Sequence, residues 1–360
     1  MATAPDSKIV RGVCPHDCPD ACAMLVTVEN GKAVAVRGDP DHPFTRGGLC
    51  VKVNNYQDRT NSPDRVLYPL KRTGAKGSGQ FKRISWDEAL AEIKTRWDAI
   101  IKEHGPTAIL PYSYLGTEGI LNGLNVGDAF FNKLGATISE RTFCDSGSCT
   151  AYFMTIGPSP GIDPESFVHS KYIILWACNT ISTNLHHWPF IAEAKKRGAK
   201  LVVIDPVKTR TAREADWHLA IKPGTDAALA LGMMNVIVAE DLVDHDYVEK
   251  YTTGFAALKA RVADFPPEKV AKITGLAAED IRKLAREYAT SQPSVIRIGV
   301  AIERHAGGGQ TVRAAACLPA LVGAWRRVGG GMLQLPIWAF PLKWENLMRP
   351  DWLTPGTRVI

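Results

Sequence analysis

Residues 171–206 read KYIILWACNTISTNLHHWPFIAEAKKRGAKLVVIDP, and this stretch decides the fold class. The apolar runs at 171–177 and 200–204 predict two buried strands, and the segment at 187–197 between them predicts a helix. A strand, a helix and a second strand in direct succession form a βαβ unit, whose two strands are parallel. The sequence therefore predicts an α/β fold with a doubly wound parallel sheet.

The chain on either side of this unit continues the alternation of helices and strands. Ser85 and Glu88 form the S-x-x-E pattern of a capping box, which predicts a helix that ends at Gly105-Pro106. This alternation extends the α/β prediction to most of the chain. The remaining expected elements are buried strands at 107–112 and 295–300 and helices at about 120–134, 226–240 and 277–290.

The N-terminal region has a different pattern, with short strand-like pieces separated by turns. LVTVENGKAVAVRG (25–38) alternates apolar and polar residues on both sides of Asn30-Gly31, which is typical of a β-hairpin. We therefore expect a small β-rich domain ahead of the α/β domains. The expected division is 1–67 for the β-rich domain, 68–165 with 291–360 for a discontinuous α/β domain, and 166–290 for a second α/β domain.

Composition excludes several classes of protein. The 360 residues are 45% hydrophobic and 22% charged, which is the ordinary globular mixture and excludes a wholly disordered chain. No window approaches ~18 uncharged apolar residues, so we expect no membrane span. The net charge of +6 comes from dispersed basic residues, so we expect no nucleic-acid partner. No apolar stretch precedes Cys14, so we expect no export signal and a cytoplasmic protein.

Four cysteines lie in the first fifty residues, at Cys14, Cys18, Cys22 and Cys50. Three closely spaced thiolates and one distant thiolate supply one sulfur ligand to each iron of a 4Fe-4S cluster. Zinc sites usually consist of two C-x2–4-C pairs, so the spacing favours the cluster, with zinc and plain structural thiols as the alternatives. Asp20, between the second and third cysteines, is typical of a turn.

Several motifs together resemble one family. They are CPHDCPDAC (14–22), GGLCVK (47–52), SPDRVLYPL (62–70) and ISWDEAL (84–90). With the later motifs, they resemble the bis-molybdopterin guanine dinucleotide oxidoreductases of the dimethyl-sulfoxide reductase superfamily. The resemblance implies a 4Fe-4S cluster on the four cysteines and a molybdenum bis(molybdopterin guanine dinucleotide) cofactor. Lys52 matches a family lysine between cluster and pterin, although an ordinary surface lysine is the alternative.

Family members are generally far longer than this chain and have a C-terminal β-rich domain. We therefore expect either a truncated sequence or a second chain that supplies the missing part.

The segment RTFCDSGSCTAY (141–152) matches the region in which the family places a Cys, selenocysteine or Ser ligand to molybdenum. Cys144 fits this position best, with Cys149 and Ser146 as alternatives, and a small buried core residue is the non-functional interpretation. Formate dehydrogenases of the superfamily carry His directly after the ligand, whereas this chain has Asp145. This difference disfavours formate oxidation.

Asn179 follows the first strand of the βαβ unit and Asp205 ends the second, so both are expected at one crevice beyond the carboxyl ends of the strands. An ionised Asp accepts two hydrogen bonds side by side, which suits the N–H edge of guanine, although Asp205 could instead cap a turn. The resemblance adds further dinucleotide contacts and a weaker set near the pterin. The dinucleotide set is Asn179, Asp205, Pro206, Thr209, Pro223, Gly224 and Asp226, and the pterin set is Gly308, Gly309 and Gln310.

The leading hypothesis is a molybdenum-dependent oxidoreductase, or its catalytic fragment, that passes two electrons between a small-molecule substrate and the 4Fe-4S cluster. It implies a redox partner protein or electron-transfer subunit. The alternative is a non-catalytic iron–sulfur electron-transfer or scaffold subunit with the same fold and no molybdenum. A zinc-bearing nucleotide-binding protein is the third hypothesis.

Overall fold

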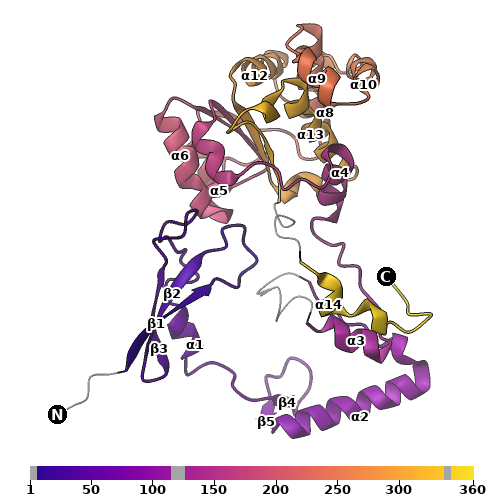
Figure 1. The fold of residues 1–360 in the computed structure, drawn as a ribbon. Coiled ribbons are helices and arrows are strands. Elements are labelled where there is room, and N and C mark those ends of the chain that lie inside the picture. The colour runs from indigo at the N-terminus through magenta and orange to yellow at the C-terminus, as the bar shows by residue number, and fades with distance from the viewer. Residues whose placement is uncertain (1–5, 115–125, 336–341) are drawn as a thin grey trace, which may run out of the picture. The chain divides into compact units, whose positions relative to one another are not determined.

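The computed structural model describes residues 6–114, 126–335 and 342–360, and Figure 1 shows its elements. The chain forms two compact units. Unit 1 comprises Met1–Asp17, Ala21–Arg141 and Leu342–Ile360, and unit 2 comprises Cys18–Asp20 and Thr142–Pro341. The three-domain division expected from the sequence has other boundaries, and it stays a prediction.

Unit 1 begins with a three-stranded antiparallel sheet of order β1-β2-β3. The strands are β1 (Ser7–Val13), β2 (Ala23–Glu29) and β3 (Lys32–Gly38). Asn30 and Gly31 connect β2 to β3 with φ values of 51° and 79°. Positive φ at both central residues is the requirement of a type I′ turn, and Asn-Gly satisfies it at low cost. The predicted hairpin is therefore confirmed.

Most residues in the rest of unit 1 are exposed or half-buried. The Oγ of Ser85 accepts from the backbone N of Glu88 over 3.1 Å, and the Glu88 carboxylate accepts from the Ser85 N over 2.8 Å, which confirms the capping box. The helix that it starts, α2 (Trp86–His104), has no buried residue. The other elements are α1 (Tyr56–Thr60), β4 (Leu70–Arg72), β5 (Phe81–Arg83), α3 (Asp128–Leu134) and α14 (Trp344–Met348).

The prediction of a strand at 107–112 is wrong. A short 3-10 helix occupies Pro106–Ala108, and no strand follows it in 109–114. Pro111 has no N–H to donate to a sheet, and Tyr112 is 75% exposed, so an apolar run here does not acquire a sheet neighbour. The helix expected at about 120–134 is described from Asp128 onward as α3, and 115–125 lie outside the described residues.

Unit 2 contains a five-stranded sheet of order β10-β9-β6-β7-β8, in which every neighbouring pair is parallel. Strands β6 and β7 confirm the two predicted strands of the βαβ unit, and β9 confirms the strand expected at 295–300. The chain runs outward from β6 to β8 and then returns to β9 on the other side of β6, so the switch point lies between β6 and β9. The strands are β6 (Tyr172–Trp176), β7 (Lys200–Ile204), β8 (Trp217–Leu219), β9 (Ser294–Ile298) and β10 (Gly331–Leu333).

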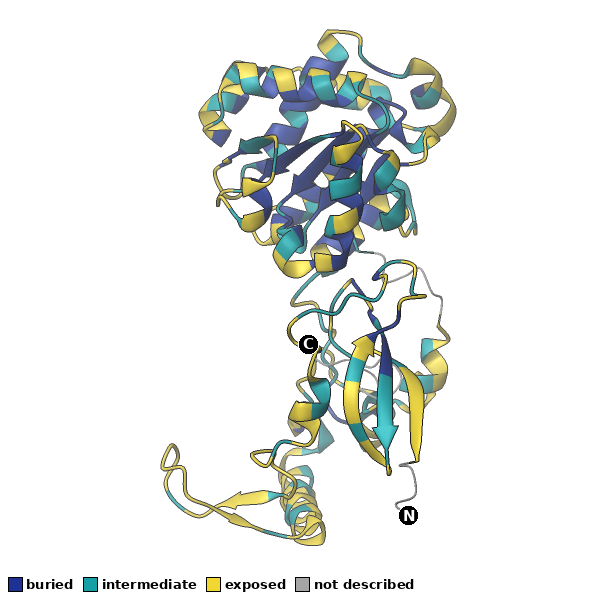
Figure 2. Cartoon of the chain, turned by 90° about the vertical axis from the view of Figure 1, so that its left-hand side faces the viewer, coloured by how far each residue is buried: buried dark blue, intermediate teal, exposed yellow. Residues whose placement is uncertain are grey.

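Both faces of this sheet are buried, as the dark blue strands of Figure 2 show. Ile174 and Trp176 join a core cluster with residues of α8, α12 and α13, whereas the alternating side chains of Ile173 and Leu175 point to the opposite face. Burial of each large side chain contributes about 1.5–3 kcal/mol. The helices are α4 (Ser146–Ile156), α5 (Thr180–Thr183), α6 (Trp188–Lys196), α7 (Arg210–Arg213), α8 (Asp226–Ala239), α9 (His245–Tyr251), α10 (Phe255–Val262), α11 (Pro267–Thr274), α12 (Ala278–Thr290) and α13 (Gly308–Leu321).

The predicted helices at 187–197, 226–240 and 277–290 are confirmed as α6, α8 and α12. The expected fold class, an α/β chain with a small N-terminal β-rich region and a parallel sheet, is therefore confirmed. Among the described residues, no helix combines the length and the apolar character needed to cross a bilayer.

Candidate functional site

At the switch point of the unit 2 sheet, the ends of β6 and β9 are held together by tight backbone contacts. The N–H of Gly299 donates to the carbonyl of Trp176 over 2.8 Å, which joins the loop after β9 to the end of β6. A Cβ on Gly299 would clash with the carbonyl oxygen of Ala177, so only glycine permits this approach. The carboxyl ends of β6 and β9 therefore meet here, where open α/β sheets bind their ligands.

Asn179 lies in the turn after β6 and is held by a threonine of α7. Its Oδ1 accepts from the Thr211 hydroxyl over 2.8 Å, and the same hydroxyl accepts from the N–H of Ile181 over 3.0 Å. Thr211 is buried, so the bond fixes the side-chain orientation of Asn179. The structure thus joins the ends of β6 and β7, as the βαβ prediction requires.

Asp205 shapes the turn after β7. Its Oδ1 accepts from the N–H of Val207 over 2.8 Å, which is the turn-capping role considered from the sequence. Thr209 caps α7, because its hydroxyl oxygen accepts from the N–H of Ala212 over 3.2 Å. Pro206 is exposed between them. The carboxylate of Asp205 retains acceptor capacity beyond this one bond, so a guanine contact stays a prediction.

Asp226 has a structural role at the start of α8. Its Oδ1 accepts from the indole N–H of Trp176 over 2.7 Å, and both residues are buried. Burial raises the pKa of the Asp226 carboxyl, and the Trp176 hydrogen bond only partly opposes that rise. Pro223 and Gly224 are exposed just before it, and a Cβ on Gly224 would lie 3.3 Å from the ring of His305. This places the loop before α8 beside the segment after β9.

Cys144 is contacted by an arginine that the sequence did not single out. The Nη2 of Arg304 donates to the Sγ of Cys144 over 3.2 Å, and its Nη1 donates to the carbonyl of Phe143 over 3.0 Å. Arg304 follows β9, so the switch-point loop holds the segment that carries Cys144. The predicted strand at 295–300 could have pointed to Arg304. If that strand neighboured β6, the residues after its carboxyl end would lie at the edge of the sheet where ligands bind.

Cys149 lies in a different environment from Cys144. It is inside α4 and 8% exposed, and its thiol donates to the Asp145 carboxylate over 3.4 Å. Burial, followed by the negative charge of Asp145, raises the pKa of the Cys149 thiol to about 12. Ser146 is the first residue of α4. The thiol of Cys149 is thus held in its protonated form, whereas metals bind the thiolate.

Of the two glycines at the start of α13, Gly308 serves close packing. A Cβ on Gly308 would clash with the backbone of Glu303, and one on Gly309 would lie 3.5 Å from the carbonyl oxygen of Gly147. Glu303 also accepts, through its carboxylate, from the N–H of Ser148 at the first turn of α4. Gln310 is exposed. The structure gives Gly308 a packing role, whereas position 309 has room for a Cβ, and the contact of these residues with a pterin stays a prediction.

Three of the four N-terminal cysteines belong to unit 1, and Cys18 belongs to unit 2. The N–H of Cys14 donates to the carbonyl of Cys22 over 2.8 Å, directly beyond the last pair of the β1–β2 ladder. Cys50 begins a turn, because its carbonyl accepts from Val53 over 3.1 Å, and Lys52 in that turn is exposed.

Thiolates suit iron as ligands, and the hydrogen bond between the backbones of Cys14 and Cys22 places these two cysteines opposite each other. Within 6–114, 126–335 and 342–360, however, no three His, Cys, Asp or Glu side chains are placed to hold a metal ion. The four-cysteine ligand set therefore stays a prediction.

Asp20 is more than the turn residue that the sequence indicated. It is 3% exposed, and its carboxylate accepts from the backbone N–H of His186 over 3.1 Å, from His186 Nδ1 over 2.7 Å and from the Asn184 amide. Burial alone would raise the pKa of this carboxyl, but the hydrogen bonds from His186 and Asn184 outweigh burial and lower it. No local pattern links Asp20 to residues this distant in the sequence.

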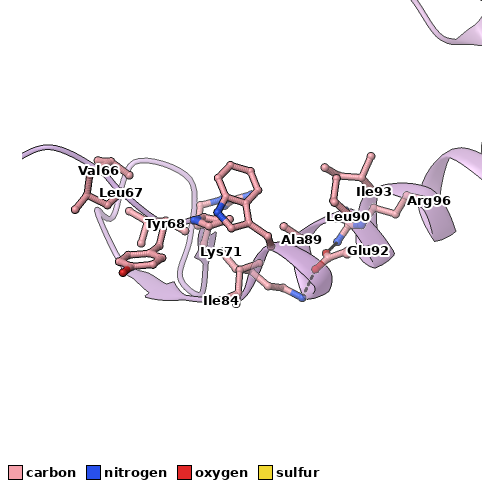
Figure 3. A pocket seen from close by; sticks show the side chains of 14 residues that line it. Val66, Leu67, Tyr68, Lys71, Ile84, Ala89, Leu90, Glu92, Ile93 and Arg96 are labelled. Atoms are coloured by element: carbon pink, nitrogen blue, oxygen red, sulfur yellow. Dashed lines mark hydrogen bonds and ion pairs between the residues drawn. The ribbon is translucent and has the colours of Figure 1, made fainter. Parts of the chain in front are cut away.

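A separate groove on unit 1, drawn in Figure 3, contains none of the predicted site residues. Trp86, Leu90 and Ile93 of α2 line it together with the chain at 66–72. Its polar side includes an ion pair between Lys71 and Glu92 at 2.7 Å. The predicted site residues lie instead around the switch point of unit 2 and in the cysteine segments.

Comparison with known proteins identifies the family. The family model described as molybdopterin oxidoreductase matches residues 65–340, and the model described as the molybdopterin oxidoreductase Fe4S4 domain matches residues 7–62. This chain belongs to the molybdopterin oxidoreductase family. The resemblance inferred from the sequence motifs is therefore confirmed.

Individual members of the molybdopterin oxidoreductase family are similar over nearly the whole chain. Probable oxidoreductase YoaE of Bacillus subtilis is 45% identical over 349 residues, which cover 97% of this chain and 51% of the relative. Dimethyl sulfoxide reductase DmsA of Escherichia coli is 31% identical over 373 residues, 90% of this chain and 44% of the relative. The solved structure of acetylene hydratase from Pelobacter acetylenicus matches with a TM-score of 0.73 and 34% identity, covering 87% of this chain and 43% of that protein. The chain thus spans about half the length of these relatives.

Proposed function

We propose that this chain is the catalytic subunit, or part of it, of a molybdenum-dependent oxidoreductase that passes two electrons between a small-molecule substrate and a 4Fe-4S cluster. The observation that carries the proposal is the hydrogen bond from Arg304 to the Cys144 thiol at the switch point. Ligands of open α/β sheets bind at such a point, and soft thiolates are ligands of transition metals. Family membership supports the molybdopterin cofactor.

Cys144 is the proposed molybdenum ligand, in preference to Cys149 and Ser146. The guanidinium of Arg304 donates a hydrogen bond to the Cys144 sulfur, whereas the Cys149 thiol donates to the Asp145 carboxylate, and burial followed by that negative charge raises the pKa of the Cys149 thiol. Arg304 also bonds the carbonyl of Phe143, so it orients the ligand loop. When bound, the molybdenum centre would supply oxygen-atom or hydride-type chemistry, and the protein would supply the thiolate, its orientation and a local positive charge.

The turns around the switch point are the proposed grip on the guanine dinucleotide tails. Asp205 has acceptor capacity left for the N–H edge of guanine, and Thr211 fixes the Asn179 amide. The exposed Pro223-Gly224 turn suits a backbone contact with phosphate or ribose. Further proposed contacts are Pro206, Thr209 and Asp226 for the dinucleotide and Gly308, Gly309 and Gln310 for the pterin.

The four N-terminal cysteines are the proposed ligands of a 4Fe-4S cluster, and the match to the Fe4S4 family model over 7–62 supports this assignment. Lys52 would place a cation beside the added electron. A redox partner protein or electron-transfer subunit would complete the electron path. The proposal includes this partner and a cytoplasmic location.

The test is the metal and pterin content of anaerobically purified protein, in the wild type and in two matched variants. About four irons and about one molybdenum per chain, with pterin guanine dinucleotide, are the expected result. Cys144→Ala is expected to lose molybdenum and keep iron, whereas Cys149→Ala keeps both. Iron without molybdenum or pterin in the wild type would instead establish the electron-transfer subunit, and zinc alone would overturn both.

If the cofactors are present, the substrate screen should cover two reaction classes. The similarity to dimethyl sulfoxide reductase supports oxygen-atom transfer with a redox dye as the electron donor. The similarity to acetylene hydratase supports a parallel assay for hydration of a small unsaturated substrate.

A further inference from the structure

The Asp20 carboxylate is buried in unit 2 although it lies between two predicted cluster ligands in the sequence. Its Oδ2 accepts two hydrogen bonds from His186, one from the backbone N–H over 3.1 Å and one from Nδ1 over 2.7 Å. Its Oδ1 accepts from the Asn184 amide. Asp20 and its two partners are all buried, and we call these three residues the Asp20 network.

The Asp20 network is continuous with the turn that carries Asn179. The short helix α5 separates Asn179 from Asn184, and the Asn184 N–H donates to the Thr180 carbonyl over 2.9 Å. At the other end of α5, Thr211 binds both the Asn179 amide and the Ile181 N–H. A chain of hydrogen bonds therefore runs within unit 2 from Asp20 through α5 to the start of α7.

We propose that Asp20 is a positioning residue, which fixes Cys18 for the iron–sulfur cluster by anchoring the segment Cys18–Asp20 of unit 2 to the turn that carries the proposed dinucleotide contact Asn179. This inference rests on the proposed function, because it assumes that Cys18 is a cluster ligand. The anchor keeps the cluster ligand and the pterin tail contact in a fixed relation. Groups that orient a metal ligand in this way control affinity and electronic properties without touching the metal.

The chemistry of the Asp20 network explains why a carboxylate is required. Three N–H donors converge on Asp20, and an ionised carboxylate accepts all of them with its two oxygens. Asparagine has the same size but only one acceptor oxygen, and its NH2 group would face a donor. Asp20→Asn therefore breaks the anchor without removing volume. The anchor also requires an N–H donor in the side chain at position 186. His186→Asn keeps an N–H near the position of Nδ1 and should preserve the anchor, whereas His186→Leu has no donor and should break it.

The experiment compares holo-protein of the wild type, Asp20→Asn, His186→Leu and His186→Asn, with Asp41→Asn as the matched control. Asp41 carries the same charge, and its side chain is 78% exposed. The readouts are the EPR spectrum of the dithionite-reduced cluster, its midpoint potential and the rate of iron release to a chelator. Thermal unfolding and amide exchange at 180–187 report whether each variant folds.

Asp20→Asn and His186→Leu are both expected to change the EPR spectrum and release iron roughly tenfold faster or more, whereas Asp41→Asn and His186→Asn resemble the wild type. His186 is the decisive position, because it lies far in the sequence from the four predicted cluster cysteines. Folded Asp20→Asn and His186→Leu proteins with the wild-type spectrum and release rate would overturn the inference and leave the proposed function standing. A wild-type protein that binds zinc or no metal would overturn both.

Discussion

Arg304 and Cys144 are joined by a hydrogen bond of 3.2 Å from the guanidinium Nη2 to the Sγ. Arg304 belongs to the loop after β9, and Cys144 belongs to the loop before α4, so the bond connects two segments far apart in the sequence. The second guanidinium nitrogen binds the carbonyl of Phe143 over 3.0 Å. The planar fork of arginine makes both contacts at once, and a lysine ammonium cannot reproduce this geometry.

The first prediction follows from that fork. Arg304→Ala and Arg304→Lys should both reduce molybdenum retention, by roughly tenfold in affinity for the alanine variant, with iron content unchanged. Elemental analysis after gel filtration measures both metals. Arg313→Ala is the control, because Arg313 is an exposed arginine on α13. If Arg304→Ala keeps a full complement of molybdenum, Arg304 does not orient the ligand loop.

The second prediction concerns pH and His187. Burial, followed by the nearby Arg297 charge, lowers the pKa of His187 to about 3. The unfolded chain binds a proton near the ordinary histidine pKa of about 6.5, so stability falls as the pH drops below that value. Because of His187, the free energy of unfolding should be roughly 2 kcal/mol lower at pH 5 than at pH 7.

Urea unfolding at the two pH values measures the His187 effect. The His187 ring packs edge-on against Phe167, with 4.3 Å between the two ring centroids. His187→Phe keeps an aromatic ring that cannot take up a proton, so it should remove that part of the pH dependence. The control is His245→Gln, since the His245 side chain is 62% exposed. An unchanged pH slope in His187→Phe would contradict the assignment.

The third prediction tests the contact at the switch point. Gly299→Ala should destabilise the protein by about 1–3 kcal/mol, because its Cβ would displace the Ala177 carbonyl. Gly309→Ala is the contrast, since its Cβ would make only ordinary contacts, the nearest at 3.5 Å, and alanine favours helices. Thermal unfolding of the two variants measures the difference. Equal melting temperatures would mean that the loop after β9 adjusts at no cost.

The sequence could predict the elements whose signals are local. Strands β6 and β7 are apolar runs that are buried on both faces. The Ser85 capping box is a pattern of only four residues, and the dipeptide Asn30-Gly31 favours a type I′ turn. The same reasoning failed at 107–112, because an apolar run becomes a strand only when a neighbouring strand accepts it. Strands β8 and β10 have three residues each, too few for a periodic pattern.

The part of the site that could not be predicted depends on pairing at long range. Asn179 and Asp205 follow neighbouring strands of one βαβ unit, so the sequence could place them at the same edge of the sheet. Arg304 reaches the crevice only because β9 returns to the side of β6, and Asp20 reaches Asn184 only through the tertiary fold. Neither pairing leaves a periodic or spacing signal in the sequence.

The last prediction separates the two roles of Asp226. Burial raises its pKa, so the folded state favours the protonated form, and this group's contribution to stability decreases as the pH rises through 3.8 toward the folded value. Asp226→Asn keeps an acceptor for the Trp176 indole and removes the cost of a buried charge, so stability at pH 7 should be equal or higher. Asp226→Ala leaves that N–H unsatisfied and should lose about 1–3 kcal/mol. Urea unfolding followed by tryptophan fluorescence measures both. A drop in pterin content in a stable Asp226→Asn protein would show that the carboxylate also contacts the dinucleotide, whereas full pterin content would leave Asp226 with its structural role alone.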